Sequence, residues 1–322
     1  MGKDQNIILL DGCTIHLNSE LGYTFVQSYP PTSHTEKMYP VNLDNEYKLT
    51  EKRLGYGSQT KIVLASAIDH DTKQFACKII NIKSLVKELA EKVKIQLAII
   101  RHVQHPCILK AIKVNLLSED NAFVIMPIYQ GGTLQDFVLQ RQRLPENEAR
   151  FIFYQLIRGI IIIHRDLKPE NIFLARDKQF PRIVIADFGL AAWMTETSFL
   201  SEDVGTLAYS APELVEGKQY NAQIDDWSIG AILYFLLTSR HAFALDGAED
   251  EDIQKLVLSG NYDTSNPVWP EVSSEAKKLI GELLAVDPKT RIRAGSCLQS
   301  EWILKDLDML ERIYLATESE VP

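Results

Sequence analysis

Hydrophobic and polar positions follow one pattern before the glycine pair at 131–132 and another pattern after it. The first part has short runs of β-branched residues with glycines between them, such as "YKLTEKRLGYGSQTKIVLASAI" from Tyr47, and such runs predict β-strands. Within it, "KELAEKVKIQLAIIRHV" carries Val93, Leu97 and Ile100 at helical spacing. The second part has a mainly helical pattern. We therefore predict an α+β chain with a β-rich first lobe and a helical second lobe.

Residues 6–26, "NIILLDGCTIHLNSELGYTFV", predict two β-runs around turn signals at Asp11–Gly12 and Gly22. Two strands alone are marginally stable in water, so this piece must pair with something or be the remnant of a larger β domain. Residues 27–43, "QSYPPTSHTEKMYPVNL", contain three prolines together with serine and threonine. That composition predicts a linker.

The net charge of the 322-residue chain is −9, and 46% of its residues are hydrophobic. This composition supports a sizeable folded core. It argues against a broad basic face of the kind that binds nucleic acid. An acidic surface would favour basic protein substrates, although a solvated exterior explains the same charge without any partner.

No two of the four cysteines form a CxxC pair or a zinc-binding spacing with histidine, so free thiols in a reducing compartment are expected. They are Cys13, Cys77, Cys107 and Cys297. No apolar run approaches the ~18 residues of a membrane-spanning helix, and the N-terminus lacks a signal-peptide core. We predict a soluble intracellular protein, nuclear or cytoplasmic, without direct contact to membrane or nucleic acid.

The segment "LGYGSQTKIVLA" has glycines at positions 55 and 57. Glycines let backbone amides approach phosphates because no Cβ is in the way, but the same pattern also fits a structural β-turn. The strand "FACKI" follows and places Lys78 between apolar neighbours. Next to a phosphate-binding turn, such a lysine is a candidate phosphate ligand.

The segment "HRDLKPEN", from His164 to Asn171, is far more specific. Asp166 can accept the proton of a substrate hydroxyl, Lys168 can neutralise charge on a transferred phosphoryl group, and Asn171 can bind a metal. "ADFGLA" follows, with Asp187 as the main magnesium ligand, and "GTLAYSAPE" ends the segment. Phosphoryl transfer needs positioning and charge neutralisation more than covalent help, and these residue types provide both.

From about Tyr47 to Trp302 the chain resembles eukaryotic protein kinases, and the lysine of "HRDLK" is the signature of their serine/threonine branch. "HPCILKAIKV", "TETSFLSEDVGT" and "PVWPEVSSEAKKLIGELLAVDPKTRI" are most similar to checkpoint kinases with a forkhead-associated (FHA) domain, including their meiosis-specific branch. "ILLDGCTIHL" and "GYTFV" are similar to the last two strands of an FHA sandwich.

The resemblance implies a bilobal kinase fold preceded by a two-strand FHA remnant. The implied parts are an FHA fragment over 1–26, a linker over 27–46, the kinase N-lobe over 47–130, the kinase C-lobe over 131–303 and a C-terminal tail over 304–322. The phosphothreonine-binding loops of an FHA domain would precede these strands, so phosphopeptide binding is expected to be lost.

The resemblance also implies ATP and Mg²⁺ as cofactors and assigns three sets of residues. The catalytic set is Asp166, Lys168, Lys78 and Thr206. The nucleotide-binding set is Leu54, Gly55, Gly57, Ile62, Ala76, Lys78, Met126, Pro127, Tyr129 and Phe173. The metal-binding set is Asn171 and Asp187.

Within these sets, Met126 would lie beside the adenine, and the Pro127 carbonyl and Tyr129 backbone would bond its edge. Proline is acceptable at 127 because only its carbonyl oxygen is needed there. Two further roles concern support of the site. Asp225 would hold the catalytic loop from below, and Glu213 would pair with Arg291.

Three residues depart from the family pattern. Thr60 replaces the third glycine of the phosphate loop. Gln96 stands where a helical glutamate pairs with Lys78, and a neutral hydrogen bond is about half as strong as a charge-assisted one. Glu202 occupies the phosphothreonine site of the activation segment, where it would either imitate part of a phosphate near Arg165 or remain a solvated acid.

The stretch "RGIIIIHRDLKPEN" is also short. Relatives carry roughly six more residues before this histidine, which is ~9 Å of helix at ~1.5 Å per residue. Gly159 is the helix breaker here, so the helix that carries Tyr154 and Leu156 is predicted to end near Arg158 or Gly159. Ile160 to Ile163 are predicted to be extended, since β-branched residues favour that backbone. The catalytic loop after them is predicted to keep its kinase geometry.

The prediction is a protein serine/threonine kinase that transfers the γ-phosphate of ATP to protein substrates in DNA-damage or meiotic checkpoint signalling. Glu170 and the negative net charge predict substrates with basic residues before the acceptor. The alternative is a catalytically weak pseudokinase, or a nucleotide- or partner-binding module, because of Gln96 and the short segment before the catalytic loop.

Overall fold

The structure is a computed structural model in which the chain divides into two compact units, Met1–Asn81 and Ile82–Pro322. The described residues are 6–9, 13–18, 22–26, 42–57, 60–69, 73–83, 85, 93–94, 97–98, 100–115, 121–160, 164–187, 206–244 and 248–318.

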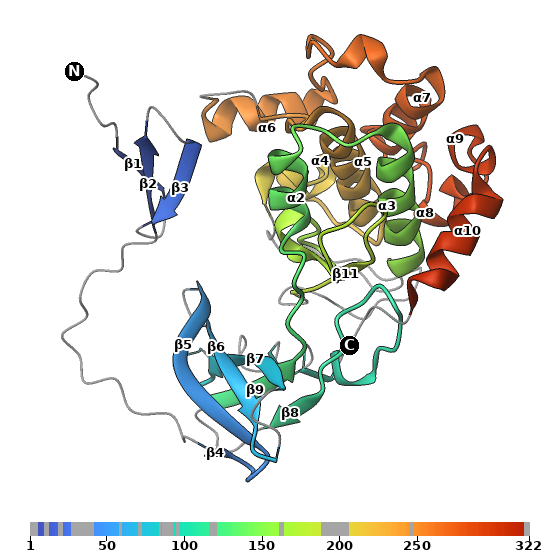
Figure 1. Ribbon diagram of the computed structural model, residues 1–322. Helices are drawn as coiled ribbons and strands as arrows, with labels where there is room; N and C mark the ends of the chain where they lie inside the picture. The colour runs from blue at the N-terminus through green and yellow to red at the C-terminus, as the bar shows by residue number, and fades with distance from the viewer. Residues whose placement is uncertain are drawn as a thin grey trace. The chain divides into compact units, whose positions relative to one another are not determined.

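The beginning of the first unit is an antiparallel sheet in the order β1-β2-β3 (Figure 1). Its strands are β1 (Asn6–Leu9), β2 (Cys13–Asn18) and β3 (Gly22–Val26). The prediction of two strands is therefore corrected to three. Two turn signals separate three apolar runs, and Asn6–Leu9 forms a strand of its own that pairs with β2. With a neighbour on each side, β2 can satisfy the backbone hydrogen-bonding groups of both of its edges.

The remaining strands of the first unit follow one another in antiparallel pairs. They are β4 (Asn42–Leu43), β5 (Tyr47–Gly57), β6 (Thr60–Ala67) and β7 (Gln74–Asn81). Alternate residues of a strand point to opposite faces. Paired Val63 and Cys77 are almost fully buried, whereas the next pair, Ile62 and Lys78, is half-buried. The face with Val63 and Cys77 is thus a core face, whereas the other face is partly accessible at Ile62 and Lys78 and buried at Leu64 and Ala76.

The second unit starts with the segment that was predicted to be helical. The described residues between 93 and 102 include helical ones, and among them Val93 and Leu97 are buried. The antiparallel pair β8 (Lys113–Asn115) and β9 (Asn121–Met126) follows. After β9 come α2 (Leu134–Gln140), α3 (Glu146–Gly159), the one-turn η1 (Pro169–Asn171), β10 (Ile172–Leu174) and β11 (Ile183–Ile185).

Helix α5 (Gln223–Thr238) is the centre of the second unit, because all of its residues from Ile224 onward are buried. A helix that is apolar on all sides belongs inside a core. Helices α3 and α7 (Ser274–Leu283) pack against it. Gly230 permits this approach, since a Cβ there would lie 2.7 Å from the Leu283 Cβ.

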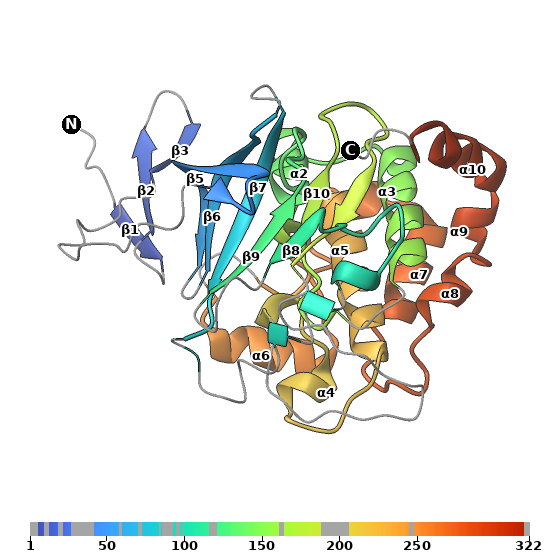
Figure 2. The same ribbon diagram turned by 90° about the horizontal axis from the view of Figure 1, so that it is seen from below.

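The other elements of the second unit surround this core (Figure 2). They are η3 (Leu207–Tyr209), α4 (Pro212–Val215), α6 (Asp250–Ser259), η4 (Trp269–Glu271), α8 (Ala294–Cys297), α9 (Glu301–Leu304) and α10 (Leu307–Ala316). Both views show α10 beside α3.

The end of α3 confirms the prediction made from the short stretch before the catalytic loop. The helix ends at Gly159, with Ile160 as its C-cap residue. A Cβ at position 159 would lie 2.9 Å from the Ile185 side chain and 3.2 Å from the Cys107 Cβ, so glycine allows the helix to end against both. Residues 161–163, which were predicted to be extended, lie outside the described residues.

Two predictions about the whole chain concern its cysteines and membranes. Cys77, Cys107 and Cys297 are buried and form no disulfide, as expected. The side chain of Cys13 lies outside the described part. None of the helices that the structure describes combines the length and apolar character needed to cross a bilayer.

Candidate active site

The catalytic loop is held by a carboxylate on the central helix. Asp225 Oδ2 accepts a hydrogen bond of 2.7 Å from the His164 backbone N–H, and Oδ1 accepts one of 3.0 Å from the Arg165 N–H. Burial raises the pKa of Asp225 to about 7, although the two backbone N–H groups lower it in part. The predicted support of the loop by Asp225 is confirmed.

His164 is the second anchor of this loop. Its ring is buried, and Nε2 donates a hydrogen bond of 2.8 Å to the carbonyl oxygen of Ala186. Burial lowers the pKa of His164, so the neutral ring is favoured. The neutral ring of His164 thus packs into the core of the second unit.

Four residues that were predicted to act at the transfer site form one hydrogen-bonded group. Lys168 Nζ donates to Thr206 Oγ1 at 2.6 Å and lies 3.1 Å from Asp166 Oδ2. Thr206 Oγ1 donates in turn to Asp166 Oδ1 at 2.9 Å. The Asn171 amide nitrogen donates to Asp166 twice, to the backbone oxygen at 2.9 Å and to Oδ2 at 3.1 Å. The structure thus brings together Asp166, Lys168, Asn171 and Thr206.

This group is only partly shielded from water. The side chains of Lys168 and Asp166 remain 21% and 18% accessible. Residues that act on a substrate from another protein have to be reachable in this way. The charged pair can therefore both hold its geometry and meet an incoming hydroxyl.

The two residues predicted to bind magnesium are joined through the backbone. The Ala186 N–H donates to the Asn171 carbonyl oxygen at 2.8 Å, and Ala186 directly precedes Asp187. Asp187 has a φ of 61°, in the left-handed region that side chains other than glycine seldom adopt. Such strain often marks a functional position.

The donor set fits magnesium. The amide nitrogen of Asn171 is directed to Asp166, which leaves its Oδ1 as the atom for a metal. Mg²⁺ prefers oxygen ligands and uses one or two protein groups together with substrate phosphates rather than a full protein cage. Among the described residues there is no group of three or more His, Cys, Asp or Glu side chains that could hold a metal.

The segment after β9 carries the residues predicted to bind adenine on this unit. Met126 ends β9 and is buried. The rings of Tyr129 and Phe173 stack with centroids 6.1 Å apart and planes at 29°. The Tyr129 hydroxyl oxygen is buried and has no hydrogen-bond partner in the part of the chain that the structure describes. Burial raises the pKa of Tyr129 to about 12, so the hydroxyl is neutral.

This segment is fixed beside β10 by backbone hydrogen bonds. The Gly131 N–H donates to the Leu174 carbonyl at 3.0 Å, and the Leu174 N–H donates to the Gly132 carbonyl at 2.9 Å. A Cβ at residue 131 would lie 2.6 Å from the Leu174 Cβ and 2.7 Å from the backbone carbon of Arg176. Glycine at 131 therefore permits the close approach that brings Tyr129 to Phe173.

On the first unit, strand register gathers most of the remaining nucleotide-binding candidates. Ile62 pairs with Lys78, and the pair two residues along is Leu64 with Ala76, so these four side chains share one face of the β6–β7 hairpin. Gly55 pairs with Ile62 from the other side. Leu54 precedes it on β5 and Gly57 ends that strand.

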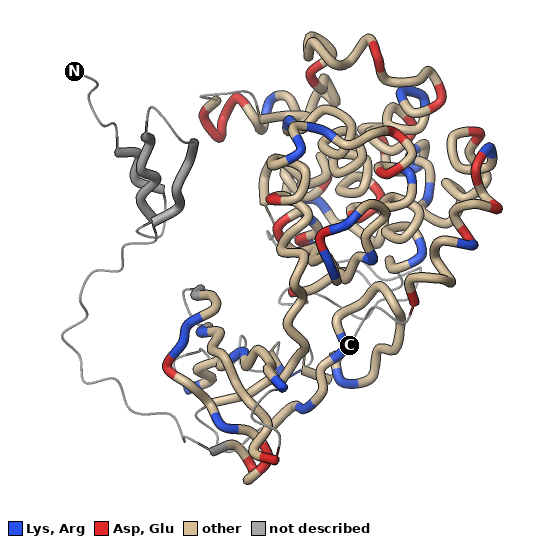
Figure 3. Tube along the Cα trace, viewed as in Figure 1, with Lys and Arg blue, Asp and Glu red and all other residues tan. Residues whose placement is uncertain are grey.

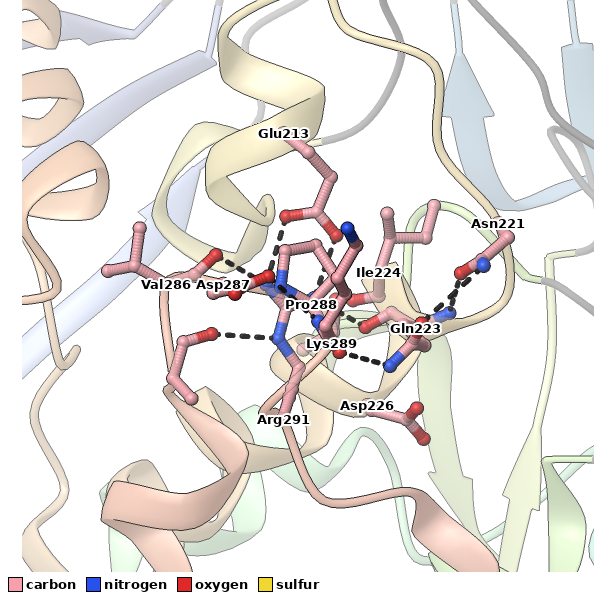
Figure 4. Close-up of polar contacts among 12 residues, drawn as sticks. Glu213, Asn221, Gln223, Ile224, Asp226, Val286, Asp287, Pro288, Lys289 and Arg291 are labelled. Atoms are coloured by element: carbon pink, nitrogen blue, oxygen red, sulfur yellow. Dashed lines mark hydrogen bonds and ion pairs between the residues drawn. The ribbon is translucent and has the colours of Figure 1, made fainter.

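The predicted pair of Glu213 and Arg291 is confirmed (Figure 4). Arg291 Nη1 and Nη2 donate to the two carboxylate oxygens of Glu213 at 2.8 and 2.9 Å. The guanidinium also donates to the backbone oxygens of Ala285, Gln223 and Val286. A buried pair needs such additional hydrogen bonds, because each ion loses its water on burial. The pair ties the segment at α4 to the beginning of α5 and to the loop before α8.

Several supporting residues were not predicted. Arg165 Nη1 donates to the Tyr220 hydroxyl at 3.2 Å. Gln155 on α3 accepts from the Ile183 N–H at 3.1 Å and donates to the Pro181 oxygen at 3.0 Å. His241 bonds to Tyr209. No motif spacing signals these contacts, because their partners lie far apart in the sequence. Two residues of interest, Gln96 and Glu202, lie outside the described residues.

Comparison with known proteins indicates a protein kinase, as does the geometry of the candidate site. The model of the protein kinase domain family matches residues 48–303. The meiosis-specific serine/threonine-protein kinase mek1 of Schizosaccharomyces pombe is 30% identical over 98% of this chain and 71% of its own length.

Two further relatives match the kinase region. The carbon catabolite-derepressing protein kinase of Candida tropicalis is 36% identical over 83% of this chain and 42% of its own length. Myosin light chain kinase A of Dictyostelium discoideum is 31% identical over 82% of this chain and 90% of its own length. The chain therefore belongs to the protein kinase family and is an ATP-dependent protein serine/threonine kinase.

Proposed function

We propose that Asp166, Lys168 and Thr206 form the site at which this kinase transfers the γ-phosphate of ATP to a Ser or Thr hydroxyl. One observation carries the proposal. The Thr206 hydroxyl donates to the Asp166 carboxylate at 2.9 Å while it accepts from the Lys168 ammonium at 2.6 Å. A substrate hydroxyl needs the same two neighbours, a base for its proton and a cation for the developing charge.

The roles follow from the chemistry of each group. Asp166 accepts the proton of the acceptor hydroxyl, for which a heavy-atom distance of ~2.6–3.2 Å is required. Lys168 offsets negative charge on the transferred group. Thr206 holds the side chains of Asp166 and Lys168 in place before the substrate binds.

Nucleotide binding involves the remaining candidates. Asn171 Oδ1 and the Asp187 carboxylate would hold magnesium, which would neutralise part of the charge on the phosphates of ATP. Lys78 would bind these phosphates. Backbone amides at Gly55 and Gly57 would approach the phosphates, as the family resemblance implies. The adenine would be held by Ile62, Ala76, Met126, Pro127, Tyr129 and Phe173, and Leu54 belongs to the same nucleotide-binding set.

Transfer of labelled phosphate from ATP to a protein substrate tests this proposal. Asp187→Ala and Asp166→Ala should abolish transfer, and Lys168→Ala should lower kcat by ~10²-fold or more, by analogy with the loss of one charge-stabilising donor. Asp177→Ala is a matched control, because Asp177 lies in the same unit with its side chain 62% accessible. Near wild-type transfer by Asp187→Ala would refute the assignment. Nucleotide binding without transfer by the wild-type chain would favour a binding module.

We further propose a role in meiotic or DNA-damage checkpoint signalling. The support is the Schizosaccharomyces pombe relative, a meiosis-specific kinase whose similarity extends over 98% of this chain. That span reaches beyond the kinase match at 48–303. The sheet β1–β3 is the part that we propose to be an FHA remnant. Nuclear or cytoplasmic location is a prediction from that role.

Basic residues before the acceptor are the proposed feature of the substrates. Glu170 lies in η1, next to the transfer residues, and burial raises its pKa. A cation from the substrate would stabilise its charged form. Acidic residues also occupy the beginning of α6, which packs on η3 (Figure 3). A peptide array without any basic preference, or an unchanged preference in Glu170→Gln, would contradict this proposal.

A further inference from the structure

His241 lies in the turn after α5 and contacts the segment that contains Thr206. Its ring nitrogen Nδ1 is 3.0 Å from the Tyr209 hydroxyl oxygen. The two rings meet edge to face, with centroids 5.6 Å apart and planes at 83°. On its other side the His241 ring stacks on Phe235 of α5, at 5.6 Å and 17°. His241 therefore lies between the last turn of α5 and the one-turn helix η3.

The position of Tyr209 is fixed by burial and by hydrogen bonds. It is 3% exposed, and its backbone oxygen accepts a hydrogen bond of 2.9 Å from the Ser228 hydroxyl of α5. Burial raises the pKa of Tyr209 well above its usual value, so the hydroxyl keeps its proton. A neutral hydroxyl can donate to His241 Nδ1, which makes the contact a directed hydrogen bond as well as a ring contact.

The η3 turn connects Tyr209 to the transfer site. The Tyr209 N–H donates to the Thr206 carbonyl at 2.9 Å, and the Ser210 hydroxyl donates to the same oxygen at 3.0 Å. The Thr206 side chain is the group that bonds to both Asp166 and Lys168. A rotation of Tyr209 would thus turn the backbone that carries Thr206.

Helix α5 carries both ends of this arrangement. Asp225, near its beginning, holds the backbone of the catalytic loop. Ser228 holds the Tyr209 backbone, and Phe235 supports the His241 ring that holds the Tyr209 hydroxyl. One rigid helix therefore sets the distance between the catalytic loop and Thr206.

We propose that His241 is a positioning residue for phosphoryl transfer, which fixes Tyr209 and, through η3, fixes Thr206 against Asp166 and Lys168. This inference rests on the proposed function for its kinetic consequence, but the ordering of η3 by His241 stands apart from catalysis. If His241 were only a packing residue, its ring stacking would matter and its hydrogen bond would not.

Four full-length variants separate hydrogen bonding from packing. His241→Phe keeps a ring against Phe235 and removes the bond, and Tyr209→Phe removes the bond from the other side. His241→Asn replaces Nδ1 with an oxygen acceptor at a similar position. The double variant Tyr209→Phe/His241→Phe tests whether both changes remove the same interaction.

The expected kinetic result is a loss of ~5-fold in kcat for each single phenylalanine variant, the usual effect of one neutral hydrogen bond. The KM for ATP should not change, because the contact lies at the acceptor side. His241→Asn should recover kcat to within ~2-fold of wild type, and the double variant should be no slower than either single variant. A wild-type kcat in His241→Phe, or multiplicative losses in the double variant, would overturn the inference.

Hydrogen exchange provides a readout that does not depend on transfer. In unliganded His241→Phe, the Tyr209 and Ser210 amides, which bond to the Thr206 and Leu207 oxygens, should exchange ~5-fold faster, by the same hydrogen-bond magnitude. Unchanged exchange at these amides would refute the positioning role even if the wild-type chain transferred no phosphate. Inactivity of the wild type together with faster exchange in the variant would instead refute the proposed function alone.

Discussion

The guanidinium carbon of Arg182 lies 3.9 Å from the centroid of the Tyr314 ring, and its Nη1 donates a hydrogen bond of 3.1 Å to the Tyr314 carbonyl oxygen. Arg182 is fully buried, and its Nε and Nη2 atoms have no hydrogen-bond partner among the residues that the structure describes. The buried Arg182 cation is thus stabilised by the face of the Tyr314 ring and by the carbonyl groups at the C-terminal end of α10.

Tyr314 also covers the last turn of α3. Its ring packs edge to face on Tyr154 at 5.8 Å, and the guanidinium of Arg158 lies 4.7 Å from its centroid. Its hydroxyl accepts a weak hydrogen bond of 3.8 Å from the Cys107 thiol. The tail after residue 303 therefore completes the core at the end of α3.

The first prediction concerns this contact. Tyr314→Ala should lower the free energy of unfolding by ~3–5 kcal/mol, because a large buried ring is lost and Arg182 is left without its main neighbour. Tyr314→Phe should cost less than ~1 kcal/mol, since the ring is kept and the weak bond from Cys107 disappears. Urea denaturation measures both values. Leu315→Ala is the matched control, because Leu315 is 65% exposed on the same helix. Equal stability of Tyr314→Ala and Leu315→Ala would refute the supporting role of α10.

The second prediction is a pH dependence that arises from Asp225. Its pKa is about 7 in the folded chain and 3.8 as the ordinary value. Between these pH values the folded chain keeps a proton on Asp225 that the unfolded chain has released. The contribution of this group to the free energy of unfolding therefore falls as pH rises through this range, by up to ~1.4 kcal/mol per pH unit.

Denaturation at a series of pH values measures this slope. Asp225→Asn should remove the contribution of this group and flatten the slope, although it should also lower stability at every pH because the amide cannot accept from both backbone N–H groups. Asp177→Asn, at an exposed acid, should keep the wild-type slope. An identical slope in Asp225→Asn and wild type would show that Asp225 does not carry the dependence.

Glu202 is the subject of the third prediction. We expect it to stand in for an activating phosphate by pairing with Arg165, whose backbone Asp225 holds. Glu202→Ala and Glu202→Gln should both lower turnover, by ~10-fold or more, since Arg165 is buried and a hydrogen bond between charged groups is worth ~1.5–3 kcal/mol. Nucleotide affinity should be nearly unchanged. Turnover equal to that of wild type in both variants would identify Glu202 as an ordinary surface acid.

Sequence motifs predicted the transfer residues of the site because phosphoryl transfer requires these residue types. Asp166, Lys168 and Asn171 lie within one short segment, so their order alone indicates their proximity. The Asp225–His164 contact and the Glu213–Arg291 pair were found through the family resemblance. Gly159 was predicted to end α3 because no other residue there breaks a helix.

The contacts that were missed join segments far apart in the chain. Arg182 and Tyr314 are separated by 132 positions, and neither belongs to a motif. The Tyr209–His241 bond spans 32 positions and depends on how the turn after α5 folds back on η3. Local patterns carry no information about such packing. The first sheet was underestimated for a different reason, because the short run Asn6–Leu9 was not counted as a strand of its own.

The last prediction returns to the end of α3. From the family resemblance we expect relatives to carry roughly six more residues before the catalytic loop, or ~9 Å of helix at ~1.5 Å per residue. The lost apolar side chains of a helix end would each cost ~2–5 kcal/mol, against a total stability of ~5–15 kcal/mol. Inserting a helix end and turn of family length after Arg158 should therefore raise the melting temperature, by ~2–4 °C for each kcal/mol recovered.

The insertion should be made in two backgrounds. In the wild-type chain the Tyr314 contacts already cover the last turn of α3. In Tyr314→Ala that cover is missing, so the inserted helix end has more stability to restore and the rise in melting temperature should be larger. Calorimetry of the four proteins measures both differences. If the wild-type chain melts as high as its repaired form while Tyr314→Ala gains stability from the insertion, α10 already replaces the missing packing, and the shortened segment gives no reason to expect weak catalysis.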